Sequence, residues 1–367
     1  MIFDSLGSSS ATAKSDGRAA ILHARLRKIA IFAGLALLAV GLKFFAFVPG
    51  MMEAAPLAMF SAPGPAPAGN SMVVQPPTLD ANGVKYYSVT SAYQGGREQT
   101  VRVLEPTNPA PGRPRRLLYV LPVEADITNR GSRFGDGLEE LRRIDAQNRF
   151  NMTLIAPSFP YEPWYGDNAS DKANSMEAFI VRELVPWGDK FLPPGTTPQR
   201  FLIGFSKPGN GALTLIFRHP DAFAAAAAWD APVQLRDINA QSGLPANFGT
   251  QENYERYFIP GLVKSCAKPF LGTNRLWISG DQGFWTADMN LLHGQLTAAG
   301  IHHTWVAGGA RAHNWSSGWL EGAVSGLDAI ASQLGQPDSK NRHAGRDASN
   351  GREIASARQV LRGSATP

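Results

Sequence analysis

Short, dense apolar runs alternate with amphipathic stretches from about residue 84 to residue 334. The clearest runs cover residues 117–121, 152–156, 201–203 and 224–229. Continuous apolar character of this length is typical of parallel strands that are buried on both faces. Between the runs, residues 175–191 carry Met176, Phe179, Ile180 and Leu184 at helical spacing. The alternation predicts an α/β fold with a mostly parallel central sheet and helices on both faces.

The weaker signals complete this arrangement. Residues 84–89 and 99–104 are predicted to form an opening antiparallel pair of strands, and residues 276–279 and 303–306 two later strands. Further helices are predicted over residues 136–148, 287–299 and 318–334. Residues 236–272 have little periodicity and are predicted to be an insertion. We find no internal repeat.

The N-terminal pattern predicts a membrane anchor. Residues 29–42 form an unbroken run of apolar residues and glycine that follows basic residues, and apolar character resumes after Lys43 up to residue 48. A bilayer needs about 20 apolar residues, and positive charge stays on the cytoplasmic side. We therefore expect a basic segment at 1–28 and a signal anchor at 29–48 in a bacterial inner membrane. The remainder would lie in the periplasm, or be secreted if the segment is cleaved.

Three further segments follow from composition. Residues 49–77 are rich in proline, alanine and glycine, which predicts a semi-extended linker. Residues 78–335 would form the catalytic domain. Residues 336–367 are polar and basic, which predicts a largely disordered tail.

Charge and composition exclude several classes of function. The chain has 367 residues, 44% of them hydrophobic, enough for a sizeable core. Its net charge of +5 is concentrated near the two ends, so we expect no nucleic-acid partner. The single cysteine, Cys266, excludes an intrachain disulfide and a cysteine-based metal site. With no metal-binding helix motif and no glycine-rich nucleotide loop, no metal or cofactor is expected. The sequence leaves the oligomeric state open.

One segment carries the strongest chemical signal: Arg200-Phe-Leu-Ile-Gly-Phe-Ser-Lys-Pro-Gly-Asn-Gly-Ala-Leu213. It ends a predicted strand and opens a predicted helix, and a serine at such a turn presents its hydroxyl as a nucleophile. We therefore take Ser206 as the candidate nucleophile. The backbone N–H of Lys207 is one expected oxyanion donor, and that of Val123 or Glu124, after the strand at 117–121, is the other.

A serine hydroxyl needs a base, which in turn needs an acid to orient it. Among seven histidines, His313 stands in a loop after the last predicted strand and directly before the last helix. It is the candidate base. Asp281 ends the strand at 276–279 and is the preferred acid. Asp230, directly after the strand at 224–229, and Asp288 remain as alternatives.

Four segments together resemble a known family. Residues 179–186, 204–213, 218–223 and 308–315 are similar to the putative-esterase branch of the α/β-hydrolases. That branch includes S-formylglutathione hydrolases, feruloyl and enterochelin esterases, and mycolyltransferases. The resemblance implies an α/β-hydrolase fold and acyl-ester chemistry with Ser206 and His313. In that branch the acid usually lies three residues after a strand-end glycine; counted from Gly280, that position is Gly283.

The function expected from these residues is that of a membrane-anchored serine esterase acting on a small-molecule or glycan ester. One alternative is acyl transfer to a sugar or lipid hydroxyl. Another is a non-catalytic binding protein with a hydrolase fold, for example for envelope polysaccharide. In each case aromatic residues are expected to surround the site and contact substrate: Trp164, Tyr165, Phe284, Trp285 and Trp315.

Overall fold

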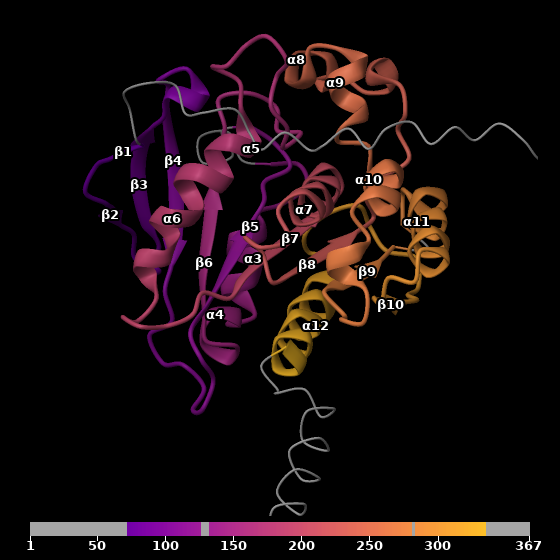
Figure 1. The fold of residues 1–367 in the computed structure, drawn as a ribbon. Coiled ribbons are helices and arrows are strands. Elements are labelled where there is room, and N and C mark those ends of the chain that lie inside the picture. Colours follow the sequence, from indigo (N-terminus) through magenta and orange to yellow (C-terminus); the bar gives the residue numbers. More distant parts are fainter. Residues whose placement is uncertain (1–71, 126–131, 281–282, 335–367) are drawn as a thin grey trace, which may run out of the picture. The chain divides into compact units, whose positions relative to one another are not determined.

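The computed structural model describes residues 72–125, 132–280 and 283–334 (Figure 1). The anchor predicted at 29–48, its basic neighbour at 1–28 and the tail at 336–367 lie outside these ranges. None of the helices within the described ranges is both long and apolar enough to cross a bilayer.

The described residues form one ten-stranded sheet. Its strands are β1 (Val73–Val74), β2 (Thr78–Leu79), β3 (Lys85–Thr90), β4 (Glu98–Leu104), β5 (Arg116–Val120), β6 (Met152–Pro157), β7 (Arg200–Phe205), β8 (Ala225–Trp229), β9 (Leu276–Ser279) and β10 (Thr304–Val306). The order is β1-β3-β4-β6-β5-β7-β8-β9-β10, with β2 also paired to β3. Strand β1 lies inside the segment predicted to be a linker and pairs with β3.

The predicted strand directions are confirmed. The parallel part of the sheet has the order β6-β5-β7-β8-β9-β10, and each strand in it runs parallel to the next one. Strands β3 and β4 form the antiparallel pair expected at the start, and β4 joins β6 antiparallel. Since the register pairs Phe205 with Trp229, strands β7 and β8 end side by side. Residues that follow these two strands therefore meet at one edge of the sheet.

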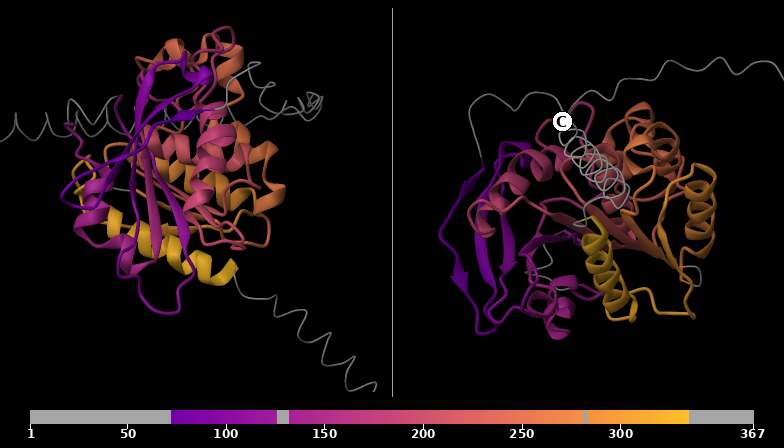
Figure 2. Two further views of the ribbon diagram at one scale, coloured as in Figure 1. Left: turned by 90° about the vertical axis from the view of Figure 1, so that its left-hand side faces the viewer. Right: turned by 60° about the horizontal axis from the view of Figure 1, so that its bottom comes forward.

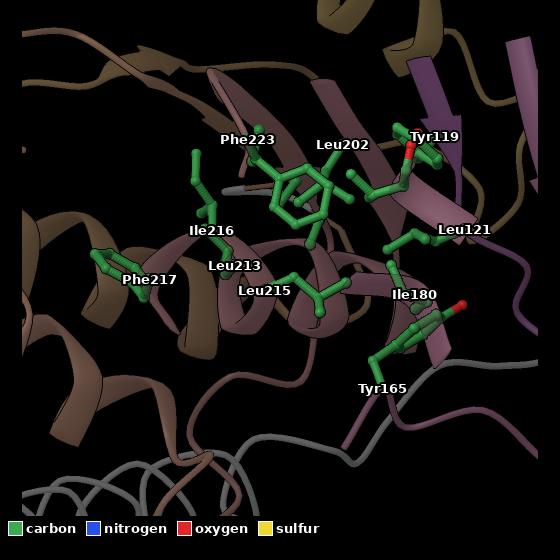
Figure 3. Close-up of a cluster of buried hydrophobic side chains, with 14 of the residues drawn as sticks. Tyr119, Leu121, Tyr165, Ile180, Leu202, Leu213, Leu215, Ile216, Phe217 and Phe223 are labelled. Carbon is green, nitrogen blue, oxygen red and sulfur yellow. Dashed lines mark hydrogen bonds between the residues drawn. The ribbon is translucent and has the colours of Figure 1, made fainter. Parts of the chain in front are cut away.

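Helices cover both faces of the sheet (Figure 2). One face carries α3 (Gly137–Arg143), α4 (Ala146–Arg149) and α12 (Trp319–Leu334). The other carries α5 (Met176–Phe179), α6 (Val185–Gly188), α7 (Lys207–Arg218), α10 (Ile259–Ser265) and α11 (Thr286–Ala298). On the second face, Leu202 of β7 packs with Leu213 and Ile216 of α7 (Figure 3). Burying each such side chain stabilises the fold by roughly 1.5–3 kcal/mol.

Two predicted helices are interrupted. The helix expected at 136–148 is split into α3 and α4 because Asp145 adopts a left-handed conformation with φ of 55°. The helix expected at 175–191 contains a wider π turn at Ile180–Leu184 between α5 and α6, and ends in the 3-10 turn Asp189–Phe191. Pro186, near the start of α6, has no N–H to donate to the carbonyl four residues earlier, so the regular hydrogen-bond pattern is interrupted at the π turn.

The insertion consists of short helical pieces, which explains its weak periodicity. They are Ile238–Ala240, α8 (Leu244–Phe248), α9 (Gln251–Glu255), α10 and Lys268–Phe270. A further 3-10 turn, Ala92–Gln94, lies between β3 and β4. The first part of the insertion packs around a small apolar cluster of its own. Trp164, from the loop after β6, belongs to that cluster.

Candidate active site

Ser206 occupies a sharp turn between β7 and α7. Its backbone has φ of 58° and ψ of −134°, a conformation that non-glycine residues rarely adopt. The turn requires a glycine at Gly204, because a Cβ atom there would lie 2.4 Å from the carbonyl carbon of Pro208. The N–H of Ser206 donates to the carbonyls of Trp229 at 3.2 Å and Asp230 at 3.1 Å. The turn is thereby tied to the end of β8.

His313 lies between Ser206 and a carboxylate. Its Nδ1 is 2.6 Å from Oδ2 of Asp230, and its Nε2 is 2.9 Å from Oγ of Ser206. An ionised carboxylate only accepts hydrogen bonds, so the Nδ1–H of His313 donates to Asp230. The neutral ring then has its lone pair on Nε2, which accepts from the Ser206 hydroxyl. The arrangement can receive the proton of that hydroxyl.

Asp230 is held on both of its oxygens. It directly follows β8, has φ of 45°, and is only 1% exposed. While Oδ2 accepts from His313, Oδ1 accepts from the backbone N–H of Trp285 at 2.6 Å. A buried carboxylate is costly unless hydrogen bonds compensate for its lost hydration. Two such bonds also limit its rotation, which fixes the oxygen that faces the imidazole.

The three candidate acids have different environments. Asp281, which the sequence favoured, lies outside the described residues. Asp288 lies on α11, where its Oδ2 accepts from the N–H of Gln234 at 2.8 Å, and burial raises the pKa of its carboxyl. Among the described carboxylates, the one that His313 contacts is Asp230, an alternative in the sequence analysis. Asp230 could be found from the sequence because it directly follows β8, the strand that pairs with β7, at whose end Ser206 lies.

Aromatic rings surround the imidazole of His313. Phe205 lies 5.1 Å from it, Phe284 5.3 Å and Phe134 5.6 Å, measured between ring centroids. Phe284 is 73% exposed, so it stands at the outer side of the site. Packing on several sides restricts the orientations that the ring can adopt.

A cavity of about 560 Å³ opens at Ser206 and His313. Its volume is in the range of small-molecule sites. Three of the five predicted aromatic residues line it: Trp164, Phe284 and Trp285. Other lining residues come from several loops: Val123, Arg133, Phe134, Glu162, Lys207, Pro232, Gln241 and Ser242.

Tyr165 and Trp315, the other two aromatic residues expected around the site, do not line this cavity, and both side chains are buried. The Tyr165 hydroxyl donates to the carbonyl of Pro122, and its ring packs on Gly211. Trp315 packs between Phe205 and Trp229, with ring centroids 5.0 and 5.5 Å away. Glycines on the neighbouring helices leave space for both rings.

The candidate oxyanion donors differ in position. Val123 lines the cavity, whereas Glu124 does not. A carboxylate oxygen of Glu124 lies 4.0 Å from Nε of Arg133. Lys207 is the first residue of α7. Its backbone N–H is one of those that have no acceptor inside their own helix. The Lys207 side chain lies in the cavity wall, where its ammonium pairs with Glu162 and lies 5.7 Å from the ring centroid of Trp164.

The described residues contain no group of three or more His, Cys, Asp or Glu side chains arranged to hold a metal ion.

Comparison with known structures identifies the fold. S-formylglutathione hydrolase from Agrobacterium tumefaciens matches with a TM-score of 0.52 at 14% identity, over 71% of this chain and 99% of that one. Fluorophosphonate-binding serine hydrolase F of Staphylococcus aureus matches with a TM-score of 0.52 at 15% identity, over 70% of this chain and 99% of that one. MPT51 of Mycobacterium tuberculosis matches with a TM-score of 0.50 at 17% identity, over 66% of this chain and 95% of that one. At such identities the likeness shows a shared fold alone.

Comparison of the sequence gives a family match over part of the chain. The search of curated proteins finds no match. Residues 155–334 match the model of the putative esterase family, and this range contains Ser206, Asp230 and His313. Over residues 155–334 the chain is thus similar to the putative-esterase branch of the α/β-hydrolases, and this match supports an ester-hydrolysing enzyme.

Proposed function

We propose that the protein is a serine esterase in which Ser206, His313 and Asp230 act as nucleophile, base and orienting acid. The observation that carries this proposal is the continuous pair of hydrogen bonds from Ser206 Oγ to His313 and from His313 to Asp230. The bond between Ser206 and His313 has a length suited to proton transfer without rearrangement, and the bond to Asp230 orients the imidazole. The cavity beside them gives an ester access to the hydroxyl.

In the first half of the reaction, Ser206 Oγ attacks the carbonyl carbon while its proton passes to Nε2 of His313. Asp230 stabilises the resulting imidazolium and holds its orientation. The backbone N–H groups of Lys207 and Val123 are the proposed donors to the oxyanion. The bond to the leaving alcohol then breaks, and His313 returns the proton to the alcohol oxygen.

In the second half, water replaces the alcohol. His313 takes a proton from water as its oxygen attacks the acyl carbon, and returns that proton to Ser206 Oγ when the acid leaves. Each oxyanion donor is expected to contribute about 10²–10³ in rate. Location outside the cytoplasm stays a prediction from residues 29–48, which the structure does not describe.

The test uses the purified protein with p-nitrophenyl acetate. We expect a burst of p-nitrophenol followed by steady turnover, and covalent labelling of Ser206 by a fluorophosphonate. Ser206→Ala should abolish both. Ser332→Ala, on α12 and away from the cavity, is the matched control and should retain both. Wild-type protein without turnover or labelling would refute the proposal and favour a non-catalytic binding protein.

A further inference from the structure

One wall of the cavity is built by two segments that are far apart in the sequence. Glu162 and Trp164 line it from the loop after β6. Gln241 and Ser242 line it from the insertion. We call residues 162–164 and 241–243 together the recognition wall.

A buried amide, Asn247 of α8, joins the two segments. Asn247 is 1% exposed, and its Nδ2 donates to the carbonyl of Glu162 at 2.7 Å and to that of Gly243 at 3.1 Å. Its Oδ1 accepts from the N–H of Trp164 at 3.4 Å. One side chain thus holds the backbone on both sides of residue 163 and the insertion turn that faces it.

The two segments also touch directly. The indole N–H of Trp164 donates to the carbonyl of Ser242 at 3.3 Å. Gly243 has φ of 86°, and a Cβ atom there would lie 2.8 Å from Oε2 of Glu162 and 3.0 Å from Nε1 of Trp164. The insertion therefore packs against the loop with no space for a side chain between them.

The recognition wall continues to the candidate nucleophile through an ion pair. The Glu162 carboxylate pairs with the ammonium of Lys207, which directly follows Ser206. The two charges compensate each other. Besides this ion pair, the wall lines the cavity with Trp164, which is 3% exposed, and with the polar residues Gln241 and Ser242. This chemistry suits an uncharged ring-shaped group that carries hydrogen-bonding atoms.

We propose that the recognition wall binds such a group of the ester, and that Asn247 is the positioning residue that holds the wall in place. The inference rests on the proposed hydrolysis by Ser206. Asn247 contacts neither Ser206 nor His313 in the hydrogen bonds described above, so its loss acts on substrate binding rather than on proton transfer. A wall displaced by a fraction of an ångström binds the ring less well.

The test compares Asn247→Ala with Asn253→Ala in the full chain. Asn253 also belongs to the insertion, and its Nδ2 donates to the carbonyls of Asp167 and Phe248, both at 2.8 Å, but it does not line the cavity. The probe is p-nitrophenyl acetate, whose leaving group is an uncharged ring with acceptor atoms. Labelling by diisopropyl fluorophosphate, which has no ring, reports the reactivity of Ser206 alone.

Asn247→Ala should raise KM about tenfold and leave the labelling rate within about twofold of wild type. Asn253→Ala should change neither, even if both variants lower Tm. If Asn247→Ala folds poorly, Asn247→Asp, which can still accept from Trp164 but cannot donate to Glu162, should show the same defect in KM.

Two results would overturn the inference. One is an Asn247 variant whose kcat and labelling rate fall together while KM stays unchanged. The other is an Asn253 variant that raises KM equally. Failure of the wild-type protein to be labelled at Ser206 would instead refute the proposed function, so the two failures are distinguishable.

Discussion

The carboxylate of Asp230 occupies the space that a side chain at Gly283 would need. A Cβ atom at residue 283 would lie 2.4 Å from both Cγ and Oδ1 of Asp230. In the esterases that this sequence resembles, the acid usually stands at the position of Gly283. Here a carboxylate reaches the same place from the end of β8, and the glycine makes room for it.

We expect Gly283→Ala to lower kcat by about a hundredfold, because the new methyl group would push the Asp230 carboxylate away from His313. Steady-state hydrolysis of p-nitrophenyl acetate measures the effect. Gly294→Ala is the control, since Gly294 lies on α11 with no atom within 4 Å of an added Cβ. Wild-type kcat in the Gly283 variant would show that the carboxylate position is not critical.

The acid should be movable between the two positions. Asp230→Gly alone is expected to lower kcat by about 10⁴-fold, because His313 loses the group that holds its Nδ1–H. Adding Gly283→Asp should raise kcat at least about tenfold above that of Asp230→Gly. The new side chain would enter the space that the Asp230 carboxylate occupies in the wild type. The same hydrolysis assay measures both variants. A double variant no faster than Asp230→Gly would mean that the backbone at residue 283 cannot direct a carboxylate to His313.

Glu162→Gln should change selectivity rather than chemistry. In this variant the positive charge of Lys207 is no longer compensated by the carboxylate of Glu162. We expect kcat/KM for the anionic ester p-acetoxybenzoate to rise about fivefold relative to p-nitrophenyl acetate. Added salt should reduce the gain. Glu255→Gln, in the insertion but away from the cavity, is the control, and an unchanged ratio in Glu162→Gln would contradict the expectation.

Asp167 should make stability fall with rising pH. Burial, reinforced by the charge of Glu177, raises the pKa of Asp167 from 3.8 to about 6. A raised carboxyl pKa stabilises the folded state fully below about pH 3.8, and that contribution is lost as pH rises through about 6. Asp167→Asn keeps an oxygen to accept from the N–H of Ala178 and removes the charge.

The measurement is urea unfolding of wild type and Asp167→Asn at pH 4.5 and pH 7.5. Between these values the variant should gain about 2 kcal/mol of unfolding free energy relative to wild type. Glu177 titrates in both proteins, so its contribution cancels in the comparison. A difference that does not change with pH would exclude Asp167 as the source.

Glu177 should be important for stability without taking part in the reaction. It is 1% exposed and accepts hydrogen bonds from Arg218 at 2.6 Å and from Tyr257 at 2.9 Å. Although burial raises its pKa, the hydrogen bond from His219 and the charge of Arg218 lower the pKa to about 2.

Glu177→Gln should cost about 3–5 kcal/mol, because it removes one charge of a buried ion pair. The control is Asp189→Asn, which breaks the more exposed pair with Arg200 and should cost about 1 kcal/mol or less. Chemical unfolding measures both changes. Equal losses in the two variants would mean that burial does not distinguish the two pairs.

Local patterns in the sequence were enough to predict the order and type of most elements. The apolar runs of β5, β6, β7 and β8 are continuous because these strands are covered on both faces, and that signal is local. The Ser206 turn was equally local, since the glycines that the turn needs lie within a few residues of it. His313 was found by its place after the last strand and before the last helix.

Which side chains meet at the site depends on the packing of segments that are far apart in the sequence. Whether Asp230, Asp281 or Asp288 faces His313 depends on how the ends of β8 and β9 lie against each other, which no local pattern encodes. Tyr165 and Trp315 look like site residues along the chain, yet Gly211 and Gly137 on other helices provide the space that buries them. Asn247 acquires its role only because the insertion folds back onto the loop after β6. Contacts between distant segments depend on packing, and packing is set by the whole fold rather than by the residues beside each position.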